Sequence, residues 1–393
     1  MFSKEVLDLE PQIISWRRHL HAHPELSFEE TETTCFLTEE LKKIPGLTLE
    51  YPTKTGVVAV LKGARPGRTI ALRADIDALP IHEETGLDFS SQVPGVMHAC
   101  GHDGHAAMQL GAAWLLSRKR EQLCGEVRFL FQHAEELPPG GAAEMVRAGV
   151  MQGVQEVYGM HLSSSFPTGT FGVRSGALTS ATDRFDITVI GKGGHSAFPE
   201  TCVDPVVTAA EIICALQTLV SRKIRAVEPA VVSVCMIQAG QAYNIIPGEV
   251  HITGSTRTFS RETRCMLPRL MEQMVRGICD ANGASCEFRS TLGYASVIND
   301  RELTEKGREV IEHTFGPGAV LEIDPLMPGE DFSAFLDSCQ GFFVELGARD
   351  EAGGCTVPHH NSRYLMDENA LKYGVEYLYQ LVCSRLSQTN DVC

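Results

Sequence analysis

The 393-residue chain has the length of two ordinary domains, each able to bury its own core. Its net charge of −16 comes from dispersed acidic residues, which argues against nucleic acid and anionic membranes as partners because both require basic patches. No uninterrupted apolar stretch is long enough to span a bilayer, and the N-terminus lacks the basic segment and apolar run of a secretory signal. The 13 cysteines form no Cys-x-x-Cys pair, which favours a reduced setting. The composition therefore predicts a soluble, cytoplasmic protein.

The first half of the chain alternates between helical and strand patterns. Apolar residues at three- and four-residue spacing predict a helix from the N-terminus to about His23, and further helices over 30–43, 103–118 and 142–148. Runs of small and branched apolar residues predict strands over 56–61, 69–73, 126–132 and 156–161. We expect Asp103 to cap the third helix. This alternation predicts an α/β layer with a largely parallel sheet.

The order of elements changes near residue 182. Strands are predicted over 183–191, 230–238, 249–258 and 284–293, with helices over 204–222 and 260–282. The order β-α-β-β-α-β is the ferredoxin-like pattern. A helix over 300–314, a short helix after 331, a strand over 341–346 and a helix over 367–386 follow. The sequence thus predicts a mixed-sheet α/β domain formed by residues 1–181 and 296–393, interrupted by an inserted α+β domain at 182–295.

Residues 97–105, with the sequence MHACGHDGH, combine one cysteine, three histidines and an aspartate. Thiolate, imidazole and carboxylate side by side suit a transition-metal site. The alternative is a polar loop whose histidines only hydrogen-bond to nearby carbonyl groups. The nonapeptide favours the metal site.

Three further places supply ligand types where strands end or loops begin. Glu136 follows one strand, His161 ends another, and His360 lies in a proline-led loop. Together with Cys100 and His102 they make five candidate ligands. A single catalytic zinc takes about three protein ligands, so five suggest two metals. Glu136, His161 or His360, taken alone, is more often a solvated or hydrogen-bonded loop residue, and the prediction depends on the set.

Glu135 is the candidate general base. Consecutive residues on an extended segment point in opposite directions, so Glu136 can bind metal while Glu135 faces the attacking water. The alternative is a solvated acidic corner. The chain has no His-Glu-x-x-His helix, no Gly-x-Ser-x-Gly turn and no Walker-type loop, and its glycine-rich stretch at 191–195 lacks dinucleotide-binding spacing. The residues therefore favour metal-dependent hydrolysis.

Residues 98–105 resemble the signature of the aminoacylase, hippurate hydrolase and auxin-conjugate amidohydrolase group. That group belongs to the two-metal peptidases that include carboxypeptidase G and succinyl-diaminopimelate desuccinylase. Other motifs follow the group's order along the chain: RRHLH at 17–21, HPELS at 23–27, RADIDALP at 73–80, AEE at 134–136, GGHSA at 193–197, NIIP at 244–247 and GEDF at 329–332.

The resemblance implies a catalytic domain with a lid used for dimerisation, and two divalent metals, most simply zinc or manganese, with cobalt or nickel as alternatives. It places the metal ligands at Cys100, His102, Glu136, His161 and His360, and the general base at Glu135. It also implies that Asp77 orients a ligand, that His195 stabilises the oxyanion in the partner subunit's site, and that Asn244 and Arg257 bind substrate. For His195 and Arg257, a turn histidine and a surface arginine are the alternatives.

The sequence departs from the group at two places. Asn361 stands where many relatives have serine, and residues 137–141 replace a shorter glycine-led run, which puts substrate detail in doubt. The predicted function is hydrolysis of N-acyl amino acids to a carboxylic acid and a free amino acid. A dipeptidase or carboxypeptidase with the same two-metal centre is the alternative among enzymes. A binding protein with structural metals is a further alternative, which the scattered, carboxylate-containing ligand set disfavours.

Overall fold

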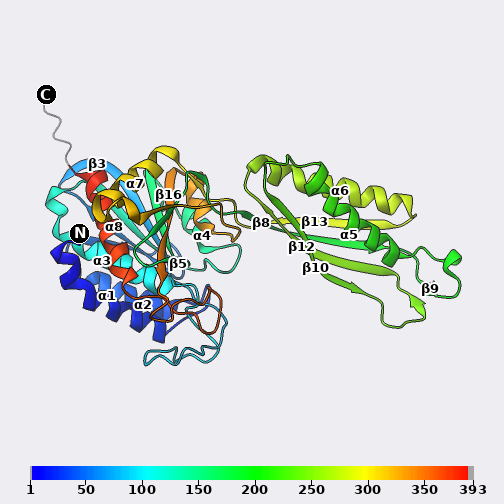
Figure 1. The fold of residues 1–393 in the computed structure, drawn as a ribbon, viewed down its shortest axis with the longest axis horizontal. Coiled ribbons are helices and arrows are strands. Elements are labelled where there is room, and N and C mark those ends of the chain that lie inside the picture. Colours follow the sequence, from blue (N-terminus) through cyan, green and yellow to red (C-terminus); the bar gives the residue numbers. More distant parts are fainter. Residues whose placement is uncertain (1, 388–393) are drawn as a thin grey trace. The chain divides into compact units, whose positions relative to one another are not determined.

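The computed structural model describes residues 2–387 and divides into two compact units (Figure 1). The first unit contains the chain up to Leu178, Val297–Asp324 and the chain from Asp331 on. The second contains Thr179–Ser296 and Pro325–Glu330. The insertion expected at 182–295 therefore lies within a few residues of the second unit's main segment. The catalytic role of the first unit and the lid role of the second remain predictions.

The first unit is built on an eight-stranded sheet with the order β1-β2-β4-β3-β5-β16-β6-β15. The strands are β1 (Leu47–Glu50), β2 (Val57–Lys62), β3 (Arg65–Asp75), β4 (Cys124–Gln132), β5 (Glu156–Pro167), β6 (Phe171–Val173), β15 (Val320–Glu322) and β16 (Gln340–Arg349). The central pairs β4–β3, β3–β5 and β5–β16 are parallel, whereas β1–β2, β2–β4 and β16–β6 are antiparallel. The predicted mixed-sheet α/β class is confirmed. The short strands β1, β6 and β15, of which β1 and β15 form the two edges of the sheet, were not predicted.

The helices of this unit follow the predicted pattern. They are α1 (Lys4–Ala22), α2 (Thr31–Lys42), α3 (His102–Arg118), α4 (Gly141–Arg147), α7 (Arg301–Phe315) and α8 (Ala370–Leu386). The unit also contains one pair of two-residue strands, β7 (Gly176–Ala177) with β14 (Ile298–Asn299), and the short 3-10 helices Arg120–Gln122, Pro317–Ala319 and Asp331–Asp337. The helix expected after residue 331 is thus a 3-10 helix.

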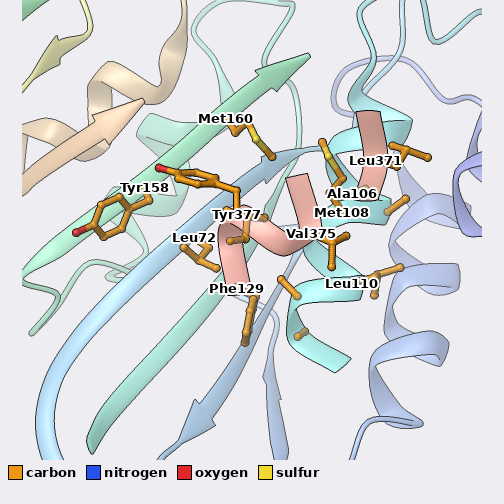
Figure 2. Packing of buried hydrophobic residues seen from close by; sticks show 14 of the residues in the cluster. Leu72, Ala106, Met108, Leu110, Phe129, Tyr158, Met160, Leu371, Val375 and Tyr377 are labelled. Carbon is orange, nitrogen blue, oxygen red and sulfur yellow. The ribbon is translucent and has the colours of Figure 1, made fainter. Parts of the chain in front are cut away.

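The main core lies where α3 and α8 pack against the centre of the sheet. Figure 2 shows Met108 of α3 and Val375 of α8 among buried side chains from β3, β4 and β5. Two glycines permit this close approach: a Cβ on Gly111 would lie 2.8 Å from Val375 Cγ2, and one on Gly374 would lie 2.0 Å from Met108 Sδ. The almost wholly buried α3 is therefore fixed in place, and its first turn carries part of the candidate site.

The expected capping role of Asp103 is wrong. Helix α3 begins one residue earlier, and its N-cap is Gly101, whose φ of 91° is left-handed and suits glycine. Asp103 instead lies buried in the first turn, with its Oδ2 2.8 Å from both Arg17 Nε and His21 Nδ1. These contacts attach α3 to α1.

The second unit has the predicted β-α-β-β-α-β order: β8 (Ala181–Ile190), α5 (Pro205–Arg222), β10 (Ala230–Ala239), β12 (Glu249–Thr258), α6 (Arg261–Ala281) and β13 (Ser285–Leu292). The antiparallel sheet has the order β10-β12-β8-β13, and Figure 1 shows α5 and α6 on one of its faces. A small sheet pairs β9 (Gly194–His195) with β11 (Ile245–Ile246), and a 3-10 helix, Pro199–Thr201, follows β9. The ferredoxin-like prediction is confirmed.

Among residues 2–387, one helix, α5, is long and apolar enough to cross a membrane, contrary to the sequence expectation. Its Ile212, Leu216 and Leu219 are buried in the core beneath the sheet. Packing in this core accounts for the buried third of the helix.

Candidate metal centre

Two groups of possible metal ligands share one residue, Cys100. Ligand atoms of Cys100, His102 and His161 all lie within 4.8 Å of one another, and so do those of Cys100, Glu136 and His360. Cys100 Sγ lies 3.4 Å from His161 Nε2, and Glu136 Oε1 lies 3.1 Å from His360 Nε2. The structure thus brings together all five residues that the sequence suggested as ligands.

The site forms at the carboxyl ends of parallel strands, where open α/β sheets usually bind ligands. Strands β3 and β4 end level with each other at Asp75 and Gln132. His161 lies on the neighbouring parallel strand β5. Among the other candidate ligands, His102 lies in the first turn of α3 and Cys100 lies just before that helix. Glu136 follows β4, and His360 lies in the loop before α8, where its amide donates to the Ala99 carbonyl over 2.8 Å.

Hydrogen bonds orient the imidazoles. His102 Nδ1 lies 3.0 Å from the Asp77 carbonyl oxygen and 3.2 Å from Asp77 Oδ1, which leaves Nε2 directed into the site. His161 Nδ1 donates to the Leu162 carbonyl over 2.7 Å, so its Nε2 also presents a lone pair. His105 differs, because its Nε2 accepts from the Leu162 amide. Asp77 therefore has the geometry of the orienting aspartate that the resemblance implied.

The chemistry of these donors fits divalent cations. His102 Nε2 and Glu136 Oε1 are buried and make no hydrogen bond of good geometry. Burial lowers the pKa of His102, but the carboxylates of Asp75, Asp77 and Glu136 raise it to about 10 overall. Burial, reinforced by Glu136 and Glu135, raises the pKa of the Cys100 thiol well above its ordinary value. Such an excess of buried carboxylate favours any cation, and metal ions bind these donor types.

The segment that carries Glu135 and Glu136 is a bend and not the extended strand assumed from the sequence. Ala134 has a left-handed φ of 48°, which is costly for a residue with a Cβ. Ligand atoms of both glutamates lie within 4.8 Å of one another and of His102. The two carboxylates therefore converge on the same place, because the bend turns them together.

His195, Asn244 and Arg257 all belong to the second unit. His195 and Asn244 are exposed and adjacent: His195 pairs with Ile245, and the Ser196 amide donates to the Asn244 carbonyl over 3.1 Å. Arg257 lies half-buried on β12. The ligand groups described above consist of first-unit residues alone, and the roles of these three residues remain proposals.

A buried ionic network that was not predicted lies beside the candidate ligands. Arg73 binds Asp75 Oδ2 through Nη1 over 2.7 Å and Asp331 Oδ1 through Nη2 over 2.8 Å. Gln132 accepts from Arg73 Nε and donates to Asp331. Asp75 also accepts from His105 Nδ1 over 2.5 Å. The motifs at 73–80 and 329–332 contain Arg73, Asp75 and Asp331, and their presence was the available signal.

Comparison with known proteins gives a family. The model of peptidase family M20/M25/M40 matches residues 71–384. The chain belongs to this family. An N-acyl-L-amino acid amidohydrolase of Geobacillus stearothermophilus is 53% identical over 292 residues, which cover 74% of this chain and 79% of the relative. Thermostable carboxypeptidase 1 of Saccharolobus solfataricus is 41% identical over 374 residues, 94% of each chain.

A solved M20 structure shares the fold. The YxeP protein of Bacillus subtilis, described as a dinuclear metal binding peptidase from the M20 family, superposes with a TM-score of 0.86 at 38% identity. The match covers 97% of this chain and 99% of that one. The resemblance noted in the sequence is thereby confirmed, and this M20 protein is a hydrolase.

Proposed function

We propose that this M20 protein is a two-metal amidohydrolase that converts N-acyl amino acids to a carboxylic acid and a free amino acid. The observation that carries the proposal is the pair of ligand groups joined at Cys100, with Glu135 beside them. The relative with 53% identity is named as an enzyme of this activity. The free state of the 12 cysteines among the described residues supports a reduced, cytoplasmic location.

One cation would be held by Cys100, His102 and His161, and the other by Cys100, Glu136 and His360. Zinc and manganese suit this mixture of donors best, with cobalt or nickel as alternatives. Bound cations supply a Lewis acid for the acyl carbonyl and a water molecule of lowered pKa. The donor chemistry and the described M20 structure support two metals over one.

Glu135 accepts the proton of the attacking water and delivers it to the leaving amine. Its carboxylate lies with that of Glu136 beside His102, among the groups that would hold the cations, which supports this role. Asp77 fixes the tautomer and orientation of His102, so His102 and Glu135 would keep the same relative positions during catalysis. The chain thus supplies proton transfer and orientation.

The second unit would complete the site as a lid in a homodimer. His195 of the partner subunit would stabilise the oxyanion, Asn244 would contact the substrate, and Arg257 would bind the free carboxylate in a bidentate manner. The exposure of His195 and Asn244 supports such contacts. The net charge of −16 supports small molecules over nucleic acid or anionic membrane as partners.

A carboxypeptidase that uses the same centre on a peptide bond is the second candidate. The observation that favours it is the relative with 41% identity, which is named as a carboxypeptidase and matches 94% of this chain. The two candidates share every residue of the metal centre and differ in the group on the acyl side of the bond.

The test is hydrolysis of a panel of N-acyl amino acids and dipeptides by metal-reconstituted protein, beside Glu135→Gln. We expect wild type to cleave acyl amino acids, and Glu135→Gln to lose about 10²–10⁴-fold in turnover while binding as much metal. Cleavage of dipeptides alone would replace the first candidate with the second. Absence of cleavage by metal-loaded wild type would contradict both.

A further inference from the structure

We infer that Glu30 is a positioning residue for the general base and one metal ligand, acting through the backbone of the bend at residues 133–136. Glu30 is not one of the candidate ligands, and it contacts the bend through the Ala134 amide. This positioning role deepens the proposed function, on which its catalytic part rests. No role was expected for Glu30, which follows the motif at 23–27 in the sequence.

Glu30 is wholly buried and uses both carboxylate oxygens as acceptors. Oε1 accepts the amide of Ala134 over 2.8 Å and the amide of Phe28 over 3.0 Å. Oε2 accepts the hydroxyl of Thr55 over 2.9 Å. Because Phe28 and Thr55 fix the carboxylate, its bond to Ala134 acts as a fixed anchor for the peptide directly before Glu135.

The anchored residue is the strained one. Ala134 holds a left-handed φ of 48°, and a residue with a Cβ keeps such a conformation only where its surroundings impose it. The Gly141 amide donates to the Ala134 carbonyl over 2.9 Å, and the Glu136 amide donates to Asp77 Oδ2 over 3.0 Å. Loss of the Glu30 bond would let the peptide rotate and would move both glutamates.

The connection between α1 and α2 therefore supports the site at two points. Ser27 donates to Asp77 Oδ2 over 2.7 Å, the same oxygen that accepts the Glu136 amide. Glu30 lies three residues further on and binds Ala134. A segment without ligands of its own thus fixes the orienting aspartate and the bend together, which explains why a polar, buried carboxylate lies at this point.

The experiment compares Glu30→Gln, Glu30→Asp and Glu30→Met in the full chain, with exposed Glu29→Gln as the matched control. Metal-free proteins are titrated with Mn²⁺ by calorimetry, and kcat and KM are measured on the best acyl amino acid of the panel. Glutamine keeps the length and one oxygen for both amides, with its NH₂ group facing Thr55. Aspartate keeps the charge but is one methylene too short, and methionine keeps neither oxygen.

We expect Glu30→Asp and Glu30→Met to bind Mn²⁺ about 10- to 100-fold more weakly and to lose kcat with KM changed less than about threefold. Glu30→Gln and Glu29→Gln should stay within about threefold of wild type in Mn²⁺ affinity. If Glu30→Met does not fold, the contrast between Gln and Asp decides. A lower unfolding temperature with unchanged Mn²⁺ affinity in the Asp and Met variants would overturn the inference. So would equal weakening by Gln and Met.

The Mn²⁺ titration separates this inference from the proposed function. If wild type binds Mn²⁺ but cleaves no acyl amino acid, the proposed function fails, whereas the positioning role stands or falls on the affinities of the variants alone. If wild type cleaves the substrates and the Asp and Met variants match it in affinity and kcat, only the positioning role fails.

Discussion

Cys100 is the residue on which both ligand groups depend, whereas His360 belongs to one of them. We therefore expect Cys100→Ala to bind less than half of the wild-type metal, and His360→Ala to keep one of two metals. Elemental analysis after gel filtration measures the content, with His313→Ala, an exposed histidine of α7, as the control. Retention of the full wild-type metal content by Cys100→Ala would contradict the shared role of the thiolate.

Arg73 is the cation of the buried network, and both Asp75 and Asp331 are almost fully shielded from solvent. Removing one partner of a buried ion pair leaves uncompensated charge, so Arg73→Met should lower the free energy of unfolding by about 3–5 kcal/mol. Urea denaturation measures this. Arg184→Met breaks an exposed pair with Asp186 and should change little. Similar losses in both variants would contradict the importance of burial.

Glu83, which is not one of the candidate metal ligands, should make the free energy of unfolding depend on pH. Burial alone would raise its pKa, but hydrogen bonds from His21, Thr85 and the Ser91 amide lower it to about 2. A depressed carboxyl pKa adds stability that is complete above the unfolded pKa of about 4.3 and disappears as the pH falls towards 2. Glu83→Gln should therefore cost about 1–2 kcal/mol at pH 6, allowing for solvent screening.

The cost of Glu83→Gln should shrink at pH 3, because the Glu83 carboxyl is then largely protonated in the unfolded state while it stays mostly ionised in the folded state. Urea denaturation of both proteins at the two pH values measures the difference. An equal cost at pH 3 and pH 6 would show that the charge of Glu83 does not contribute to stability.

Ligand types could be found from the sequence at residue scale because cysteine, histidine and glutamate are chemically distinctive. The residues that hold these side chains in position could not be found in this way. Glu30 lies 104 residues before Ala134, and its hydrogen bond becomes visible only once α2 and β4 are placed in space. Asp331 lies 199 residues after Gln132. Composition and spacing carry no information about such pairs.

At the scale of elements, long periodic segments were predictable and short or strained ones were not. Helix α5 was expected at 204–222 and lies at Pro205–Arg222. Strands of three or four residues, such as β6, are too short to show a period. The bend after β4 was taken as extended because nothing in its sequence signals a left-handed alanine. Tertiary hydrogen bonds impose that conformation.

Two glycines should respond in opposite ways to alanine. A Cβ on Gly277, exposed within α6, would meet no atom within 4 Å, so Gly277→Ala should raise the free energy of unfolding by about 0.5–1 kcal/mol. A Cβ on Gly141 would lie 1.9 Å from the His133 carbonyl oxygen. Since that contact is with backbone, Gly141→Ala must move the bend, and we expect loss of metal affinity as well as of stability.

Thermal unfolding of the two alanine variants, with Mn²⁺ titration of each, measures both effects. Gly277→Ala should leave Mn²⁺ affinity unchanged because α6 carries none of the described ligands. If Gly141→Ala bound Mn²⁺ like wild type, the bend would not need its observed shape to hold the metal.

At the scale of the molecule, each unit has a hydrophobic core of its own. The change from alternating α/β order to β-α-β-β-α-β order made the insertion predictable from the sequence. The return of Pro325–Glu330 to the second unit was not, because it depends on backbone pairing. The Ser180 amide donates to the Leu326 carbonyl over 3.0 Å, and Thr179 forms a parallel bridge with Leu326.

Separate cores lead to a prediction about metal removal. The five candidate ligands all belong to the first unit, so bound metal should raise the unfolding temperature of that unit and not of the second. At a metal concentration near 100 Kd, the gain is about 2.7 kcal/mol, or roughly 5–10 °C for a unit of this size. Differential scanning calorimetry of chelator-treated and Mn²⁺-loaded protein measures it.

Variants identify the transitions. Gly277→Ala should raise the midpoint temperature of the unfolding transition that does not respond to metal, because α6 lies in the second unit. Arg73→Met should lower the midpoint temperature of the transition that metal stabilises, because its partners Asp75 and Asp331 lie in the first unit. If Mn²⁺ raised the transition marked by Gly277→Ala by the same amount, the two cores would unfold as one cooperative system, and the metal would stabilise the molecule as a whole.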